Sequence, residues 1–236
     1  MPLWYFIRMI QANIVHIKDD IASICHRLKK NFDEVTFIGV TKYVNAGQVK
    51  EVVNAGVTDI GENRVGDAKE KFELLGNSVE ITKHLIGHLQ TNKVKEAVGL
   101  FDLIQSVDSL KVAKEIEKQA ANINKVMDVL IEVNVSGEEQ KYGFCPKDVM
   151  PAIEEIRSFK HVRVLGLMTM APFVDDENII RNCFRGLKSL FEEVKAGYSA
   201  CSNIEMKYLS MGMTADYKIA LEEGSNMVRI GRAIYV

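Results

Sequence analysis

Residues 36–56, TFIGVTKYVNAGQVKEVVNAG, contain one complete strand–loop–helix unit, and the rest of the chain is interpreted from it. The β-branched run at 36–41 predicts a buried strand. Asn45 and Gln48 have the spacing of a helix N-cap and its third-position partner, and three valines follow at helical spacing. Gly56 stands where a helix-ending glycine belongs. The stretch therefore predicts a β/α unit.

The same unit recurs along the chain. Short apolar runs predict eight strands, at Thr36–Thr41, Val57–Gly61, Ile81–Gly87, Leu100–Ser106, Val126–Val135, Val162–Met168, Glu205–Leu209 and Met227–Ile230. Segments of helical periodicity separate them, including a long helix from about Asp176 to Lys195 that ends at Gly197, and a short helix over Thr214–Glu223. No helix is expected after the last strand.

This alternation implies a parallel sheet, because each crossover between parallel strands needs a helix. An open doubly wound sheet usually has fewer strands, and no G-x-G-x-x-G sequence follows the first strand. We therefore predict a closed (β/α)₈ TIM barrel. Apolar residues spaced four and three apart predict an additional helix from Ile10 to about Leu28, which precedes the barrel and caps it.

Length and composition agree with one barrel domain. The chain has 236 residues, and about 250 are typical of a single α/β barrel. We interpret residues 1–9 as an N-terminal extension, with Met9 as an alternative start, and residues 10–236 as the barrel. After the eighth strand only 233–236 remain, so we expect no second domain.

Charge and cysteine content exclude several classes of protein. With 30 Lys and Arg against 32 Asp and Glu, the formal charge is −2, which argues against a nucleic-acid partner. No apolar run approaches the roughly 20 residues of a membrane span. The four cysteines are scattered, which favours neither a disulfide framework nor a zinc site. We expect a cytoplasmic protein.

Residues that follow the strands are the candidates for chemistry, because active sites of TIM barrels lie at the carboxyl ends of the strands. Lys42 follows the first strand, where partial desolvation would make its amine a nucleophile for carbonyl carbon. A solvated lysine at a strand end is the commoner alternative. His84 and His88 would lie about 13 Å apart along one strand face, so we expect no metal site.

An anion site is also indicated after strands seven and eight. Residues 210–214, SMGMT, offer hydroxyls and a glycine immediately before the predicted short helix, and Gly231 with Arg232 would add donors. A simple N-cap at Thr214 and a tight turn at Gly231 are the alternative. Lysine and a phosphate site on one face suggest a phosphorylated carbonyl compound, either pyridoxal phosphate or an aldolase-type sugar phosphate.

Several motifs resemble those of a known family, the pyridoxal-phosphate homeostasis proteins (YggS/PROSC family). The similarity runs in order from about residue 10 to the C-terminus. The segments that carry it are GVTK (39–42), DIGEN (59–63), HLIGHLQTNK (84–93), IQSVD (104–108), VNVSGEE (133–139), GLMTMAP (166–172), LSMGMTAD (209–216) and VRIGRAI (228–234).

The resemblance implies a fold like the N-terminal barrel of alanine racemase and a pyridoxal 5′-phosphate cofactor held as a Schiff base on Lys42. By the same resemblance, Arg229 would face the pyridine nitrogen and Asn63 would lie beside the Schiff base. The phosphate would be surrounded by Ser210, Gly212, Met213, Thr214, Gly231 and Arg232. The chain departs from the family at Val44, where a second lysine is frequent, and at Lys83, where an aromatic residue is common.

The family points to a role in intracellular pyridoxal-phosphate homeostasis, with no established catalytic turnover. The cofactor itself and apo-enzymes that use it are the expected partners, and we expect a monomer or a weak dimer. A cofactor-dependent amino-acid racemase or lyase is the alternative function, and a barrel enzyme acting on a sugar phosphate through Lys42 is a third.

Overall fold

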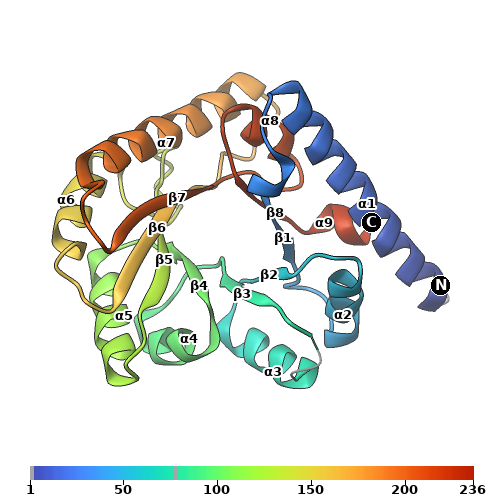
Figure 1. Ribbon diagram of the computed structural model, residues 1–236, viewed down its shortest axis with the longest axis horizontal. Helices are drawn as coiled ribbons and strands as arrows, with labels where there is room; N and C mark the ends of the chain where they lie inside the picture. The colour runs from blue at the N-terminus through green and yellow to red at the C-terminus, as the bar shows by residue number, and fades with distance from the viewer. Residues whose placement is uncertain (1–2, 77–78) are drawn as a thin grey trace.

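Eight parallel strands close into a barrel in the computed structural model, which describes residues 3–76 and 79–236 (Figure 1). The strands are β1 (Thr36–Val40), β2 (Asp59–Glu62), β3 (Thr82–Leu85), β4 (Leu103–Val107), β5 (Met127–Glu132), β6 (Val162–Met168), β7 (Ile204–Ser210) and β8 (Met227–Ile230). β1 pairs with β8, which aligns Ile38 with Arg229 and closes the ring. The predicted (β/α)₈ fold is confirmed, with strand ends shifted by a few residues.

Helices cover the outside of this barrel (Figure 1). They are α1 (Leu3–Arg27), α2 (Ala46–Asn54), α3 (Val65–Leu75), α4 (Val94–Leu100), α5 (Leu110–Asn122), α6 (Pro146–Ile156), α7 (Glu177–Tyr198), α8 (Tyr217–Glu222) and α9 (Arg232–Tyr235), with 3₁₀ turns η1 (Phe32–Glu34) and η2 (Thr91–Lys93). The predicted capping box forms, with reciprocal 3.0 Å hydrogen bonds between Asn45 and Gln48. No helix in this described part of the chain is both long and apolar enough to cross a membrane.

The first helix is longer than predicted. It begins at Leu3 rather than Ile10, because no glycine or proline interrupts 3–10 and nothing ends the helix there. The predicted apolar face is correct, since Ile14 and Ile21 are fully or almost fully buried. The boundary between an extension and the barrel at residue 10 stays a prediction.

α1 occupies the outside of the barrel where β8 meets β1. The last strand leads into the four-residue α9, which the sequence does not predict. α1 covers this part of the barrel by packing against α2, α8 and α9 (Figure 1). Asn13 donates to the carbonyl of Ile234 at 3.2 Å, and Tyr217 donates to Asp20 at 2.7 Å.

Two other helix ends differ from the prediction. α7 continues through Gly197 to Tyr198, because glycine inside a helix is tolerated where the flanking turns pack. α8 begins at Tyr217 rather than Thr214. The Asp216 carboxylate accepts a hydrogen bond from the Met213 amide at 2.6 Å and closes a turn there, which delays the helix.

Apolar side chains pack on both faces of the sheet. A large buried cluster lies between the strands and the helices. A smaller one draws on β1 and β8 and, from the opposite side of the ring, on β4, β5 and β6, so it fills the interior. Its members are Ile38, Leu103, Leu130, Leu165, Met168 and Met227. Each such side chain contributes about 1.5–3 kcal/mol when fully buried.

Gly166 marks a close approach of β6 to β7. Its φ of +149° accompanies a shift in the register of this strand pair. A Cβ at this position would stand 1.8 Å from the carbonyl oxygen of Tyr208, which is backbone and cannot rotate away.

We expect Gly166→Ala to lower the free energy of unfolding by roughly 2–5 kcal/mol, because the clash and the backbone strain add. Urea unfolding measures this loss. Gly99→Ala is the matched control, because a Cβ on Gly99 in α4 meets nothing within 4 Å, and it should stabilise the protein slightly. Equal effects of the two substitutions would contradict the close approach.

Candidate functional site

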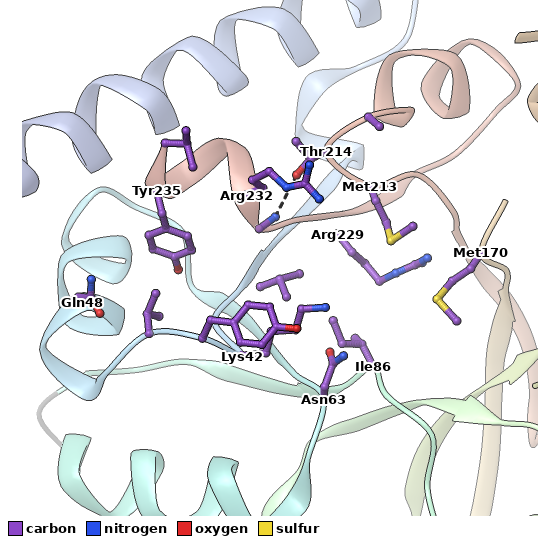
Figure 2. Close-up of a pocket in the computed structure, with 16 residues that line it drawn as sticks. Lys42, Gln48, Asn63, Ile86, Met170, Met213, Thr214, Arg229, Arg232 and Tyr235 are labelled. Carbon is purple, nitrogen blue, oxygen red and sulfur yellow. Dashed lines mark hydrogen bonds between the residues drawn. The ribbon is translucent and has the colours of Figure 1, made fainter. Parts of the chain in front are cut away.

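A cavity of about 660 Å³ opens at the carboxyl ends of the strands (Figure 2). Seven of the predicted site residues line it: Lys42, Asn63, Met213, Thr214, Arg229, Gly231 and Arg232. In Figure 2 the side chains of Lys42, Asn63 and Arg229 project into the same space from the ends of β1, β2 and β8. Residues nearly 190 positions apart in the chain therefore meet in one site, as the closed barrel requires.

Ser210 and Gly212 do not line the cavity. Ser210 is fully buried beneath it, and its hydroxyl is engaged by Arg229 and Gln105. Gly212 has φ +99°, and a Cβ there would stand 2.6 Å from Ala220, so this residue lets the loop after β7 turn closely over α8. Its carbonyl accepts the amide of Arg229 at 2.9 Å. Ser210 and Gly212 therefore support the cavity wall without being exposed in it.

Lys42 is exposed at the mouth of the cavity. Its Nζ lies 5.1 Å from the centre of the Tyr43 ring, a cation–π distance. An accessible amine on this rim can meet a carbonyl compound that enters from solvent.

A buried ion pair supports the strand end that carries Lys42. Lys71 of α3 donates to the carbonyl of Thr41 at 2.6 Å and pairs with Glu62, which is fully buried. The Thr41 hydroxyl also donates to Glu62 at 2.5 Å. Removing one partner of such a pair is strongly destabilising, since a buried charge is left uncompensated. The pair therefore holds the backbone directly before Lys42.

Arg229 begins a hydrogen-bonded chain through the barrel interior. Its guanidinium, 3% exposed, donates to Ser210 at 2.6 Å and to the Thr169 carbonyl at 2.8 Å. Ser210 donates to Gln105 Oε1 at 2.7 Å. Nε2 of Gln105 lies 3.1 Å from His84 Nδ1, and His84 Nε2 lies 2.9 Å from a carboxylate oxygen of Asp59.

The donors in this chain all point the same way. An arginine can only donate, so the Ser210 hydroxyl accepts from Arg229 and donates its own hydrogen bond to Gln105. The amide nitrogen of Gln105 also only donates, so His84 Nδ1 accepts this hydrogen bond. His84 Nε2 in turn donates a hydrogen bond to the Asp59 carboxylate. These contacts fix the orientation of the His84 ring. The chain connects β8, β7, β4, β3 and β2 and fixes the guanidinium of Arg229.

Burial shifts the pKa values of three ionisable groups around this site. Burial lowers the pKa of Arg229 to about 10, opposed by the charges of Asp216 and Glu132, and the guanidinium stays protonated at neutral pH. Burial, reinforced by the nearby charge of Asp108, raises the pKa of Glu132 to about 7. Burial also raises the pKa of Asp216. The deep end of the cavity therefore holds one permanent cation with weakly acidic carboxyl groups near it.

The loop after β7 is not followed directly by the predicted short helix, because α8 begins at Tyr217. The alternative of an N-cap at Thr214 is therefore wrong, and the Thr214 hydroxyl accepts from the Gly231 amide at 3.4 Å instead (Figure 2). The backbone amides of Thr214, Ala215 and Arg232 have no partner within the described residues. These amides lie on residues that line the cavity, and the side chain of Arg232 is exposed beside them. Anion recognition at this end would therefore use turn amides and a guanidinium.

One polar group of the wall is not expected from the sequence. Tyr235 lines the cavity from α9, and its hydroxyl is buried with no hydrogen-bond partner in the described structure. Burial and the charge of Glu62 raise its pKa. No signal marked it, because the sequence predicted no helix after β8. An unpartnered hydroxyl, an amine and free amides in one cavity fit a polar ligand that carries an aldehyde and an anionic group. The described residues contain no group of three metal-ligating side chains.

Comparison with known proteins shows the family of the chain. Residues 13–236 match the family model of the alanine racemase N-terminal domain. A pyridoxal phosphate homeostasis protein of Aquifex aeolicus is 38% identical over 93% of this chain and 94% of its own. The chain belongs to the pyridoxal phosphate homeostasis family.

Solved structures related to this homeostasis family member have the same fold. A protein of unknown function from Bifidobacterium adolescentis is 32% identical, with a TM-score of 0.91 over 100% of this chain and 98% of its own. PipY of Synechococcus elongatus, solved with pyridoxal phosphate bound, is 28% identical, with a TM-score of 0.80 over 93% of this chain and 100% of its own. Relatives of the chain are thus named for homeostasis of a cofactor rather than for a reaction.

The raised pKa of Glu132 predicts how pH affects stability. Its pKa of about 7 in the folded protein exceeds the ordinary 4.5, so the native state binds this proton more tightly than the unfolded chain does. The contribution of Glu132 to the free energy of unfolding is complete below the ordinary pKa and is lost as pH rises through about 7. Glu132→Gln stays neutral throughout and avoids this loss.

We therefore expect Glu132→Gln to gain stability over the parent protein by roughly 3 kcal/mol more in alkaline than in acidic buffer. Urea unfolding on either side of this pH range measures the difference. Glu139→Gln, at an exposed position in the loop after β5, should show no such gain. A pH-independent effect of Glu132→Gln would contradict the assigned burial.

Proposed function

We propose that this chain binds pyridoxal 5′-phosphate in the cavity at the barrel mouth, with its aldehyde carbon joined to Lys42 as a Schiff base. The protein acts in the cytoplasm on the supply of this cofactor rather than on a substrate of its own. The observation that carries the proposal is the meeting of the exposed Lys42 amine, the buried Arg229 guanidinium and unpartnered backbone amides in one cavity. The bound cofactor of PipY, a relative of this chain, supports it.

Arg229 determines how strongly the ring of the bound cofactor can withdraw electrons. Pyridoxal phosphate supplies an aldehyde that amines attack and a ring that withdraws electrons when its nitrogen is protonated. A protonated guanidinium beside that nitrogen disfavours its protonation. Since Ser210 and the Thr169 carbonyl hold this guanidinium, it cannot turn away. The site thus favours holding the cofactor over using it as a strong electron sink.

The opposite end of the cavity would hold the phosphate. The amides of Thr214, Ala215 and Arg232 offer donors that need no reorganisation, and the Arg232 guanidinium adds charge from an exposed position. Thr214 contributes its hydroxyl, which already contacts Gly231. These groups come from the loop after β7 and from α9, so retention of the phosphate depends on both.

The rim of the cavity favours exchange with other molecules. Lys42 and Tyr43 are exposed, and the ring of Tyr43 is 89% accessible. Another amine can therefore reach the carbon held by Lys42. We propose apo-enzymes that use the same cofactor as recipients, and a monomer or weak dimer as the working form, because this rim is open in the single chain.

Reconstitution with pyridoxal phosphate tests the proposal. We expect the parent protein to turn yellow and to retain the cofactor after borohydride reduction, whereas Lys42→Ala does neither. Absorbance and peptide mass spectrometry give the readout. Lys50→Ala removes an exposed lysine of α2 and should behave as the parent does. Equal labelling of Lys42→Ala would exclude Lys42, and failure of the parent protein to bind would exclude the function.

Two arginines of the cavity should have separable effects. Arg229→Gln keeps hydrogen-bond donors but loses the charge, so we expect the reconstituted protein to keep its cofactor with a shifted absorbance and a changed pH titration of that absorbance. Arg232→Gln, at the exposed end, should weaken binding about tenfold and leave the spectrum unchanged. If Arg229→Gln leaves the spectrum as it was, Arg229 does not face the ring.

A further inference from the structure

A second cleft, of about 510 Å³, lies directly beside the Lys42 cavity and shares Asn63 with it as a common wall. The start of α3, the segment between β3 and η2, and the last residue of η2 form its other walls. The proposed function uses none of the residues that line it except Asn63. This cleft also lies at the carboxyl edge of the barrel, because its walls follow β2 and β3.

Basic side chains dominate this cleft. Two cations, Arg64 and Lys93, and the imidazole of His88 line it, against a single carboxylate from Asp67. Arg64 has no ion pair or side-chain hydrogen bond among the described residues. Lys93 has only a 3.9 Å contact with Glu96, and both side chains of that pair are substantially exposed. Such a contact contributes little, so both cations remain available to a ligand.

His88 is held rigidly at the edge of the cleft. Its Nδ1 lies 2.8 Å from the Asp108 carboxylate, and its ring stacks on Tyr142 with centroids 3.7 Å apart and planes 10° apart. Because a carboxylate can only accept, Nδ1 donates its proton to Asp108, and Nε2 is the ring nitrogen left to face a ligand, which donates to an anion when it too carries a proton. Three loops, after β3, β4 and β5, are needed to fix this one imidazole. Its pre-organised position is typical of a residue that contacts a ligand.

Backbone donors complete the cleft. Arg64 occupies the N-cap position of the eleven-residue helix α3 but makes no side-chain capping hydrogen bond. The amides of Val65, Gly66 and Asp67 therefore have no partner in the described residues, and all three residues line the cleft. Gly66 leaves open space, since a Cβ there would meet nothing within 4 Å. The start of α3 thus adds backbone donors to a cleft in which two separate segments already place positively charged side chains.

We propose that this cleft binds a small anion, through a carboxylate or phosphate group, between Arg64, Lys93 and His88. The carrying observation is the convergence of two cations without strong partners and a clamped imidazole on an open cleft. The site is distinct from the Lys42 cavity and does not require a cofactor there. Because Asn63 belongs to both walls, an anion in the cleft lies next to whatever Lys42 holds.

Nuclear magnetic resonance of the histidine ring signals tests the site without interference from the Lys42 cavity. The His88 signal is assigned as the one that His88→Gln removes. We expect it to shift saturably when inorganic phosphate or glutarate is added, while the signal of the buried His84 stays in place. A response to one anion alone identifies which group the cleft takes. No response of His88 to either anion would overturn the proposal.

Charge variants test the assigned contacts. Arg64→Met and Lys93→Met should each lower the affinity for the anion about tenfold, as expected for a lost charge-assisted contact. The anion used is the one that shifts the His88 signal. Lys95→Met is the matched control: it removes an exposed lysine two residues along the chain that does not line the cleft, and affinity should not change. Equal affinity in all three variants would show that these cations do not bind the anion.

A steric variant gives a test that does not depend on charge. Gly66→Phe fills the open space at the start of α3, so we expect it to abolish the anion-dependent shift while the melting temperature stays close to that of the parent protein. Gly99→Phe places the same side chain on α4, also in open space and outside the cleft, and should retain the shift. Undiminished binding by Gly66→Phe would place the anion elsewhere and refute the site.

Discussion

The buried guanidinium of Arg229 is the constraint on which the rest of the site depends. A charge that is 3% exposed inside a barrel needs compensation, and the protein supplies it with a hydrogen-bonded chain rather than with a direct ion pair. Ser210, Gln105 and His84 carry that chain to Asp59, so the polar groups at the centre of the barrel are satisfied by one another. Five strands must be in register for this to occur.

The same register brings the functional side chains together at one edge. In a closed parallel barrel every strand ends on the same face, so Lys42, Asn63 and Arg229 converge although they come from distant parts of the sequence. The buried pair of Lys71 and Glu62 then fixes the backbone before Lys42 from the outside. The barrel interior therefore orients the deep, charged end of the cavity, and α3 orients its reactive rim.

The barrel fold and several of the residues that line the cavity can be predicted from the sequence. Strands and helices alternate with clear periodicity, so the barrel and the residues after each strand could be predicted. Side-chain hydrogen bonds could not, because they depend on register across the barrel: Ser210 was assigned to the phosphate but lies beneath Arg229. Tyr235 was missed because α9 is too short to have a period. The alternative of an N-cap at Thr214 fails because Asp216 accepts from the Met213 amide and closes a turn before α8 begins.

The packing of α1 on the last helix has a thermodynamic consequence. Asn13 is tied to the carbonyl of Ile234, and the next residue, Tyr235, forms part of the cavity wall. Docking of the N-terminal helix and completion of the cavity are therefore linked equilibria. A ligand that binds only the complete cavity must, by reciprocity, slow the local opening of α1 and the hydrogen exchange of its amides. The segment most distant in sequence from the last strand thus reports on occupancy of the site.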